Sequence, residues 1–318
     1  MQTVLWDAEV NLALRESLAP VVPVLDQITH LGDGAVLIAM AVWIYWFGGA
    51  ETGRERAFVI AIGVAAFALA TGIKGIVALP RPDLAFAPAG YPGYSFPSAH
   101  ALGAAAFYGA LAVTIERRSR LLRYSLAGIV IFLVSLSRLT LGVHYLGDVL
   151  VGAFLGLSLV WIGHRWRHNG QFRPGLVFVL ATALALVTVA LGSRVWASLV
   201  IGAGVGGGIG WHWVKGRRTT DSGAAILVTG FVAFIGLAIA AAIPLAVGTP
   251  TPGAPDPVPF VVETIAYLLV VAFVMGLPAI ATAVEDDSRV RRLQRVLPFR
   301  RRRVQFDALG EEIESTDD

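Results

Sequence analysis

Apolar residues along this chain gather into long windows that short polar stretches separate. A helix that crosses the hydrocarbon core of a bilayer needs about 20 apolar residues, and a helix satisfies its own backbone polar groups in lipid. We therefore expect an all-α integral membrane protein with about nine transmembrane helices. The windows lie at 32–49, 57–79, 98–115, 121–141, 146–163, 174–192, 195–214, 223–247 and 260–284.

Residues 1–30 depart from this pattern. Charged residues interrupt the apolar ones between Asp7 and Asp26, and Pro20 and Pro23 break any long helix. Short helices of this kind lie in the membrane interface or dip into it. We expect one or two such interfacial or re-entrant helices before the first span.

Composition agrees with the window pattern. Apolar residues make up 56% of the 318 residues, charged residues 15%, and the mean hydropathy is +0.70. A soluble domain carries about 25% charged residues, so a multi-span membrane protein is indicated. The chain has no cysteine, which excludes disulfides, thiolate chemistry and cysteine metal sites.

Basic residues alternate between the loops and predict the orientation. Most of the 25 Lys and Arg residues fall in the loops after the first, third, fifth and seventh windows and in the tail after the ninth. Because cytoplasmic loops carry an excess of Lys and Arg, these loops and the C-terminus are expected in the cytoplasm. Lys74, Arg81 and Arg138 then lie towards the opposite face, where topology does not account for them.

These cations belong to segments that end on that same external face. The segments are "KGIVALPRPD" from Lys74, "SFPSAH" ending at His100, and "SRLTLGVHYLGD" from Ser137. Together they offer cations that match the oxygens of a phosphoryl group, because Arg binds such groups bidentately and Lys acts as a point charge.

The start of the third window adds backbone donors to this expected site. Ser98 follows Pro97 and is placed as the N-cap of a helix. The backbone N–H groups of Ala99 and His100 would then point outwards as an anion site. A phosphate group is thus expected among Lys74, Arg81, Arg138 and this helix start.

Two histidines supply the expected chemistry. His144 and Asp148 are four residues apart, which places them on one face of a helix. Asp148 can accept from Nδ1–H of His144 and so leave Nε2 as a nucleophile. His100, across the pocket, can protonate the leaving oxygen and then activate water.

These residues resemble the signature of the type 2 phosphatidic acid phosphatase superfamily, which includes acid phosphatases and vanadium haloperoxidases. Lys74, Arg81 and Pro82 match its first part, and Pro97, Ser98, Ala99 and His100 match the second, with alanine in place of the family's glycine. Ser137, Arg138, His144 and Asp148 match its third part, and the spacing agrees throughout.

The resemblance covers roughly residues 1–165 and implies several properties. It implies a helical-bundle core, a phosphohistidine on His144, acid/base work by His100 and a reaction without a metal or other cofactor. Phosphate would bind at Ser98 and the nearby backbone. We divide the chain into interfacial helices (1–30), a phosphatase core (31–170), a four-helix membrane extension (171–286) and a cytoplasmic tail (287–318).

The function expected from these observations is hydrolysis of a lipid phosphate or diphosphate at the extracytoplasmic face. Phosphatidate, a phosphatidylglycerol phosphate or a polyprenyl diphosphate would fit a site at the ends of membrane helices. Transfer of the phosphoryl group to an alcohol is a variant of this chemistry. A transporter or scramblase that uses the basic pocket to bind headgroups is the alternative from another class, and the spans disfavour a haloperoxidase.

The tail runs from a basic stretch, "RVRRLQRVLPFRRRR", to an acidic end, "EEIESTDD". A basic run just inside a membrane attracts anionic headgroups. We expect anionic lipids as its partners and no nucleic acid. The sequence leaves the oligomeric state and the role of the C-terminal helices open.

Overall fold

The structure, a computed structural model, describes most of the chain as helix. It describes residues 4–47, 53–88, 93–115, 118–191, 194, 196–233, 257–297, 305–306 and 312–313. Within these ranges, β1 (Gln305–Phe306) and β2 (Glu312–Ile313) form a two-residue antiparallel pair, and the other regular elements are helices. The expected all-α membrane class is confirmed.

Each apolar window contains a helix. The helices are α3 (Gly34–Phe47), α4 (Gly53–Val77), α5 (Ala99–Thr114), α6 (Arg120–Thr140), α7 (Leu146–His168), α8 (Pro174–Ala190), α9 (Ala197–Val214), a helix at Gly223–Ala233, and α11 (Pro257–Ile280). By length and composition, 4 of the described helices can cross a membrane, or up to 5 if the bent pair Ala19–Gly32 and Gly34–Phe47 forms one span. The number of nine spans therefore stays a prediction.

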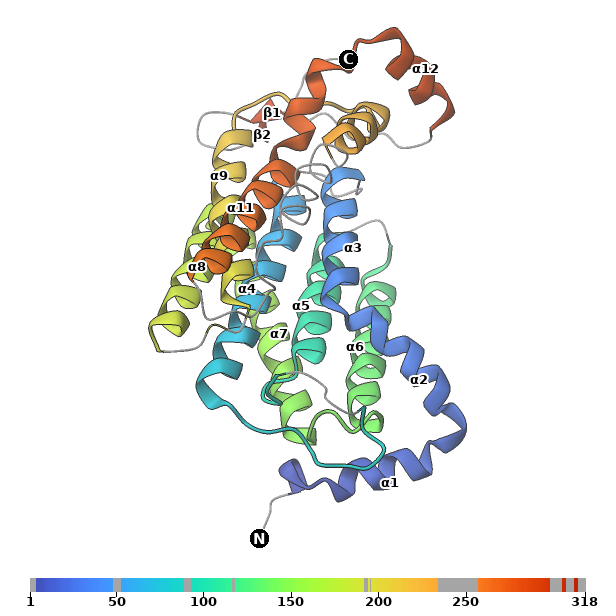
Figure 1. Cartoon of the computed structure of the whole chain (residues 1–318). Helices are drawn as coiled ribbons and strands as arrows, with labels where there is room; N and C mark the ends of the chain where they lie inside the picture. Colours follow the sequence, from blue (N-terminus) through green and yellow to red (C-terminus); the bar gives the residue numbers. More distant parts are fainter. Residues whose placement is uncertain are drawn as a thin grey trace.

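Residues 4–32 form a series of short helices, and their expected position in the membrane interface stays a prediction. They are η1 (Val4–Trp6), α1 (Glu9–Ser17), η2 (Ala19–Val21), α2 (Val22–Ile28) and η3 (Thr29–Gly32). Pro20 and Pro23 stand in the first turns of η2 and α2, where a missing N–H costs no hydrogen bond. In Figure 1, α1 crosses the lower end of the bundle and α2 leads up to α3.

Close packing of α5 against α7 positions the site. Gly152 and Gly156 of α7 face the backbone of α5, and a Cβ at Gly152 would stand 2.7 Å from the carbonyl oxygen of Ser98. Glycines four residues apart let two helices approach closely. The Ser98 N–H consequently reaches the carbonyl of Asp148 at 3.0 Å, so the starts of the two helices are held together.

The C-terminal helices form a separate layer. In Figure 1, α8, α9 and α11 gather on one side of α4, and α12 (Ser288–Val296) lies at the opposite end of the molecule from α1. Apolar side chains of α4, α8 and α9 make up the contact, among them Ala68, Ala181 and Val200. The proline-rich stretch Gly248–Phe260 lies largely outside the described residues.

Candidate functional site

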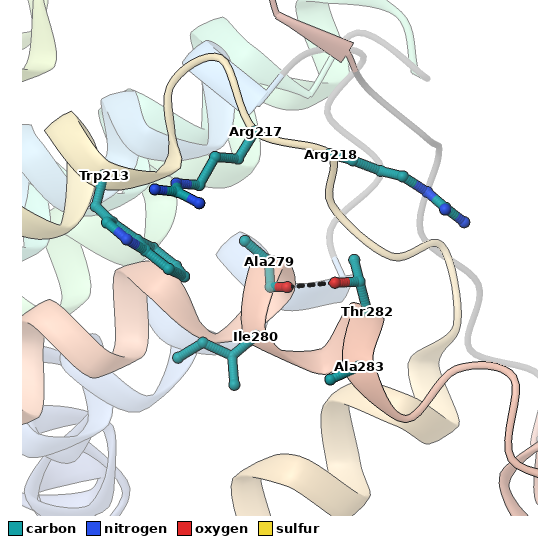
Figure 2. A pocket seen from close by; sticks show the side chains of 7 residues that line it. All are labelled: Trp213, Arg217, Arg218, Ala279, Ile280, Thr282 and Ala283. Carbon is teal, nitrogen blue, oxygen red and sulfur yellow. Dashed lines mark hydrogen bonds between the residues drawn. The ribbon is translucent and has the colours of Figure 1, made fainter.

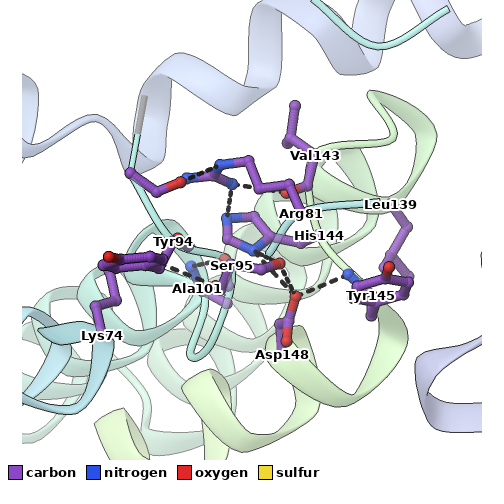
Figure 3. A network of polar contacts seen from close by, with 12 residues as sticks. Lys74, Arg81, Tyr94, Ser95, Ala101, Leu139, Val143, His144, Tyr145 and Asp148 are labelled. Carbon is purple, nitrogen blue, oxygen red and sulfur yellow. Dashed lines mark hydrogen bonds and ion pairs between the residues drawn. The ribbon is translucent and has the colours of Figure 1, made fainter. Parts of the chain in front are cut away.

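The predicted site residues meet at the end of the bundle that α1 crosses. Lys74 lies in the last turn of α4, Ser98 and His100 start α5, and His144 lies between α6 and α7. Figure 3 shows part of this cluster, with Lys74, Arg81, Ser95, His144 and Asp148 converging from these elements. The sequence-predicted convergence of three distant segments is therefore present in the structure.

His144 and Asp148 meet, although not in the way expected. Helix α7 begins at Leu146, so His144 precedes it and the pair does not share a helix face. Tyr145 has an extended backbone (φ −73°, ψ 160°), which turns the His144 ring back towards the first turn. Nδ1 of His144 lies 3.3 Å from Oδ2 of Asp148.

The Asp148 carboxylate is held firmly through the same oxygen. Oδ2 also accepts from the Tyr145 N–H at 2.8 Å and from the Ser95 hydroxyl. All three groups are largely or fully out of solvent: Ser95 and Asp148 are 0% exposed and His144 2%. Among the residues that the structure describes, Oδ1 of Asp148 has no hydrogen-bond partner.

The second ring nitrogen of His144 faces a guanidinium. Nη1 of Arg81 lies 3.1 Å from Nε2 of His144 and donates to the Val143 carbonyl at 2.6 Å. Because a guanidinium cannot accept, Nε2 must carry the lone pair and Nδ1 the hydrogen. The geometry thus selects the tautomer in which Nε2 accepts from Arg81 and Nδ1 carries the hydrogen.

Burial and nearby positive charge both lower the pKa of His144. Burial, and next the positive charge of Arg81, lower the pKa of the His144 imidazole well below its usual range. Lys74, Arg138 and His100 lower this pKa further. Because all these effects disfavour the charged imidazolium, the ring is neutral around neutral pH.

Lys74 and Arg81 are anchored by one loop. Lys74 is 7% exposed, and its Nζ donates to the carbonyls of Tyr94 and Ser95 at 2.6 and 2.9 Å. Arg81 Nε donates to the Gly93 carbonyl at 3.2 Å. The ammonium and the guanidinium are therefore held by backbone acceptors beside His144.

The start of α5 has the expected form. Ser98 is the N-cap, and its Oγ accepts from the Ala101 N–H at 3.4 Å. Ala99 occupies the first helical position, where alanine is well tolerated. No positive φ is needed there, so alanine can replace the family's glycine without backbone strain.

Arg138 and His100 contact the N-terminal segment. Arg138, 1% exposed, donates from Nη1 to the Thr29 hydroxyl at 2.7 Å. Nε2 of His100 lies 2.8 Å from Oδ1 of Asp33. These partners stand more than 60 positions away in sequence from the residues they contact.

Several residues at the site carried no signal in the sequence analysis. Asn11 is fully buried, and its Nδ2 donates to the carbonyls of Leu139 and His144 at 2.8 and 3.0 Å. Arg15, whose simplest interpretation is a lipid-headgroup contact, donates to the Thr140 carbonyl at 2.7 Å. A charged or polar residue in an amphipathic segment normally indicates a solvated face, so periodicity could not identify these contacts.

A hollow lies far from this cluster, between the ends of α9 and α11. Figure 2 shows its lining, which includes Trp213, Arg217 and Arg218, and its volume is about 510 Å³. Arg217 stands 4.6 Å from the centre of the Trp213 ring, and Arg218 pairs with Glu285. The hollow contains none of the predicted site residues. Within the described ranges, no group of three His, Asp or Glu side chains could hold a metal ion.

Comparison with known proteins links residues of this cluster to a family. A family model described as the PAP2 superfamily matches residues 55–172. Phosphatidylglycerophosphatase B of Bacillus subtilis (strain 168) is 32% identical over 148 residues, which cover 44% of this chain and 71% of that protein.

One solved structure is also similar. It is the crystal structure of the first transmembrane PAP2 type phosphatidylglycerolphosphate phosphatase from Bacillus subtilis. The TM-score is 0.44 at 27% sequence identity, and the match covers 52% of this chain and 88% of that one.

Proposed function

Because this chain belongs to the PAP2 superfamily and is a membrane phosphatase, we propose that it hydrolyses a lipid phosphate or diphosphate at the extracytoplasmic face through a phosphohistidine on His144. Phosphatidylglycerophosphatase B of Bacillus subtilis acts, by its name, on phosphatidylglycerophosphate. Phosphatidylglycerol phosphate is therefore the first substrate to test. Phosphatidate and a polyprenyl diphosphate are the next candidates.

The arrangement around His144 is the observation that carries this proposal. Asp148 and Ser95 hold the Nδ1 side of the ring, while Nε2 faces the cationic group of Arg81. A neutral imidazole with its lone pair among cations can attack a phosphorus atom whose oxygens those cations bind. The carboxylate of Asp148 then stabilises the positive charge that develops on the ring.

Two displacements at phosphorus complete the reaction. In the first, Nε2 of His144 attacks phosphorus, the bond to the lipid oxygen breaks, and His100 gives that oxygen a proton. In the second, His100 takes a proton from water as the water oxygen attacks, and the P–N bond breaks. Phosphate leaves, and both histidines return to their starting states.

The placement of the site supports a lipid substrate at the external face. The site lies at the ends of membrane helices, where the headgroup of an amphiphile lies. Basic residues gather at the opposite ends of α6 and α7, where Arg120 begins α6 and Arg165 lies in the last turn of α7. By the positive-inside rule, that end is cytoplasmic and the site is external.

The basic tail is proposed to bind the cytoplasmic leaflet. Helix α12 carries Arg289, Arg291, Arg292 and Arg295, while Leu293 and Val296 are exposed. A short helix with arginines and exposed apolar side chains suits the headgroup region of anionic lipids.

The first test combines turnover with chemical trapping. Purified protein in detergent is assayed for phosphate release from phosphatidylglycerol phosphate, phosphatidate and a polyprenyl diphosphate, with and without EDTA. His144→Ala should abolish release, whereas His168→Ala, which removes an exposed imidazole at the end of α7, should not. After an alkaline quench, mass spectrometry should find a phosphoryl group on His144, and vanadate should inhibit.

Different results would favour the alternatives. Headgroup binding or transport that survives His144→Ala, with no phosphate released by the unaltered protein, would indicate a transporter or scramblase. Appearance of a new phosphoester when an alcohol is added would indicate a phosphotransferase. Robust turnover that His144→Ala leaves intact would contradict the nucleophile.

A further inference from the structure

A second carboxylate–histidine pair, Asp33 and His30, adjoins the site through His100, and the proposed mechanism uses neither of these two residues. Asp33 lies between η3 and α3. Its Oδ1 is 2.8 Å from Nε2 of His100, and its Oδ2 is 2.7 Å from Nδ1 of His30. The side chains grow more exposed along this row, from 19% for His100 through 36% for Asp33 to 61% for His30.

The packing of η3 against α5 and α6 holds Asp33 in place. A Cβ at Gly32 would stand 2.6 Å from Cγ1 of Val134 and 3.3 Å from Cβ of His100. Glycine therefore permits an approach of the chain that a larger residue would prevent. The Tyr108 hydroxyl donates to the Leu31 carbonyl at 2.9 Å, which fastens the same segment from α5.

The Asp33 side chain precedes a helix, but it pairs with two histidines. An aspartate just before a helix usually caps it by accepting from the backbone N–H groups of its first turn. Here both carboxylate oxygens are paired with imidazole nitrogens. A role in helix capping does not account for this arrangement, because a cap needs neither histidine.

His100 needs a negative partner if it is to act as an acid. Arg138 and Arg81 place positive charge near its ring, while Asp33 is the carboxylate that contacts it. Nearby cations disfavour an imidazolium, and a hydrogen-bonded carboxylate favours it. With one ring nitrogen bound to Asp33, the other is left for proton transfer to the leaving oxygen.

We propose that Asp33 is a positioning residue for the acid/base histidine His100, and that His30 links this carboxylate to solvent. The inference rests on the proposed function, since it assumes that His100 transfers the proton. Asp33 fixes the ring and stabilises its protonated form during the first displacement. His30 holds Oδ2, so that Asp33 keeps its orientation towards His100.

The proposal is tested with Asp33→Asn, Asp33→Glu and His30→Gln in the full chain. Glu16→Gln is the matched control, because it removes a carboxylate from the same N-terminal segment at an exposed position. Turnover of dioleoyl phosphatidate in detergent is measured between about pH 5 and pH 9. Thermal unfolding of each variant is followed in parallel.

Asp33→Asn should lower kcat by about 10- to 100-fold, within the range of general acid–base effects, and change KM far less. The alkaline limb of the pH profile of Asp33→Asn should move to lower pH, because His100 then loses its proton at a lower pH. Asp33→Glu should restore part of kcat and the position of the limb. His30→Gln should lower kcat by a few fold, and Glu16→Gln should match the unaltered protein.

Other outcomes would overturn the inference. If Asp33→Asn kept kcat and the pH profile while His100→Ala lost activity, the proposed function would stand and the role of Asp33 would fall. The positioning role of Asp33 would also be contradicted if Asp33→Asn lost activity and thermal stability together and if its residual activity showed the same alkaline limb as the unaltered protein. Full activity of His100→Ala would remove His100 from the mechanism and with it the role of Asp33, whereas a lack of phosphate release by the unaltered protein would remove the proposed function itself.

Discussion

The two regions that flank the residues matched by the family model behave differently towards the site. The N-terminal segment makes three hydrogen bonds to the candidate site. Asn11 donates to the carbonyl of His144, Thr29 accepts from Arg138, and Asp33 pairs with His100. The C-terminal helices α8, α9 and α11 lie beside the core and contact it through apolar side chains such as Ala181 and Val200.

This difference separates two ways in which a chain extends a catalytic core. The N-terminal segment supplies hydrogen bonds to the groups whose position decides the chemistry. The C-terminal layer supplies close packing: a Cβ at Gly202 or Gly210 of α9 would come within 2.6 Å of α11. We infer that damage to the first region affects turnover and damage to the second affects stability.

The largest effect on turnover is expected from Asn11→Ala in the N-terminal segment. This change leaves the carbonyls of Leu139 and His144 without their donor, and the loop that carries the proposed nucleophile loses its anchor. A misplacement of about 1 Å can cost about 100-fold in rate. We therefore expect kcat for a lipid phosphate to fall by about 10- to 100-fold, measured as phosphate release at saturating substrate.

Asn169→Ala is the control for this variant, since it removes an exposed asparagine beyond α7. It should retain the activity of the unaltered protein. A kcat of Asn11→Ala within about twofold of that value would show that α1 covers the site without positioning it.

The protonation of His144 gives a second test, of intermediate size. Its pKa lies well below the usual value of about 6.5, because the ring is buried and Arg81 stands beside it. The neutral form therefore persists as the pH falls through 6.5, and protonation begins at lower pH. Imidazole ¹⁵N NMR, with His144→Ala for assignment, should show this neutral tautomer with hydrogen on Nδ1.

The same titration sharpens the comparison of the two regions. Asn11→Ala loosens the cover over His144 and should move the titration back towards the ordinary imidazole range. Substitutions within α9 should leave it unchanged. Half-protonation of His144 at or above about pH 6.5 in the unaltered protein would contradict the burial of the ring.

The smallest effect on turnover is expected from Gly206→Ala in α9. A Cβ at Gly206 would clash with the Leu268 carbonyl of α11, so the two helices must separate and the melting temperature in detergent should fall by several degrees. The kcat of the folded protein should stay within about twofold. Gly128→Ala, where a Cβ meets nothing within 4 Å, is the control and should not destabilise.

A result in the other direction would revise the division of labour. If Gly206→Ala lowered kcat tenfold at temperatures where the protein remains folded, the C-terminal helices would have to shape the site or the path of the substrate to it. The N-terminal segment would then support catalysis by hydrogen bonds to the site, and the C-terminal helices would support it through the shape of the core.

Much of the candidate site followed from residue types, their spacing and the family resemblance. Lys74, Arg81, Ser98, His100, Arg138, His144 and Asp148 were found from their positions in three segments. Their types are chemically unusual at the ends of apolar helices, because uncompensated charge there is costly. The N-cap role of Ser98 also followed from the sequence, since Pro97 and the apolar run after it define where a helix starts.

Other contacts could not be read from the chain. Ser95 lies within the stretch that ends at His100, yet nothing in its neighbours distinguishes it from a loop serine. The partnership of Asp33 with His100 joins positions 67 apart. The expected shared helix face of His144 and Asp148 was wrong, because i and i+4 spacing leaves open where the helix begins.

The sequence by itself determined the helical class, the membrane setting and the groups proposed to react, because apolar length, charge placement and motif spacing are local properties of a chain. Tertiary structure decided which side chains hold those groups in place. Asn11, Thr29 and Asp33 reach the site because η3 packs against α5 and α6 and α1 crosses their ends. A hydrogen bond between distant residues depends on how helices pack, and packing arises from the whole fold.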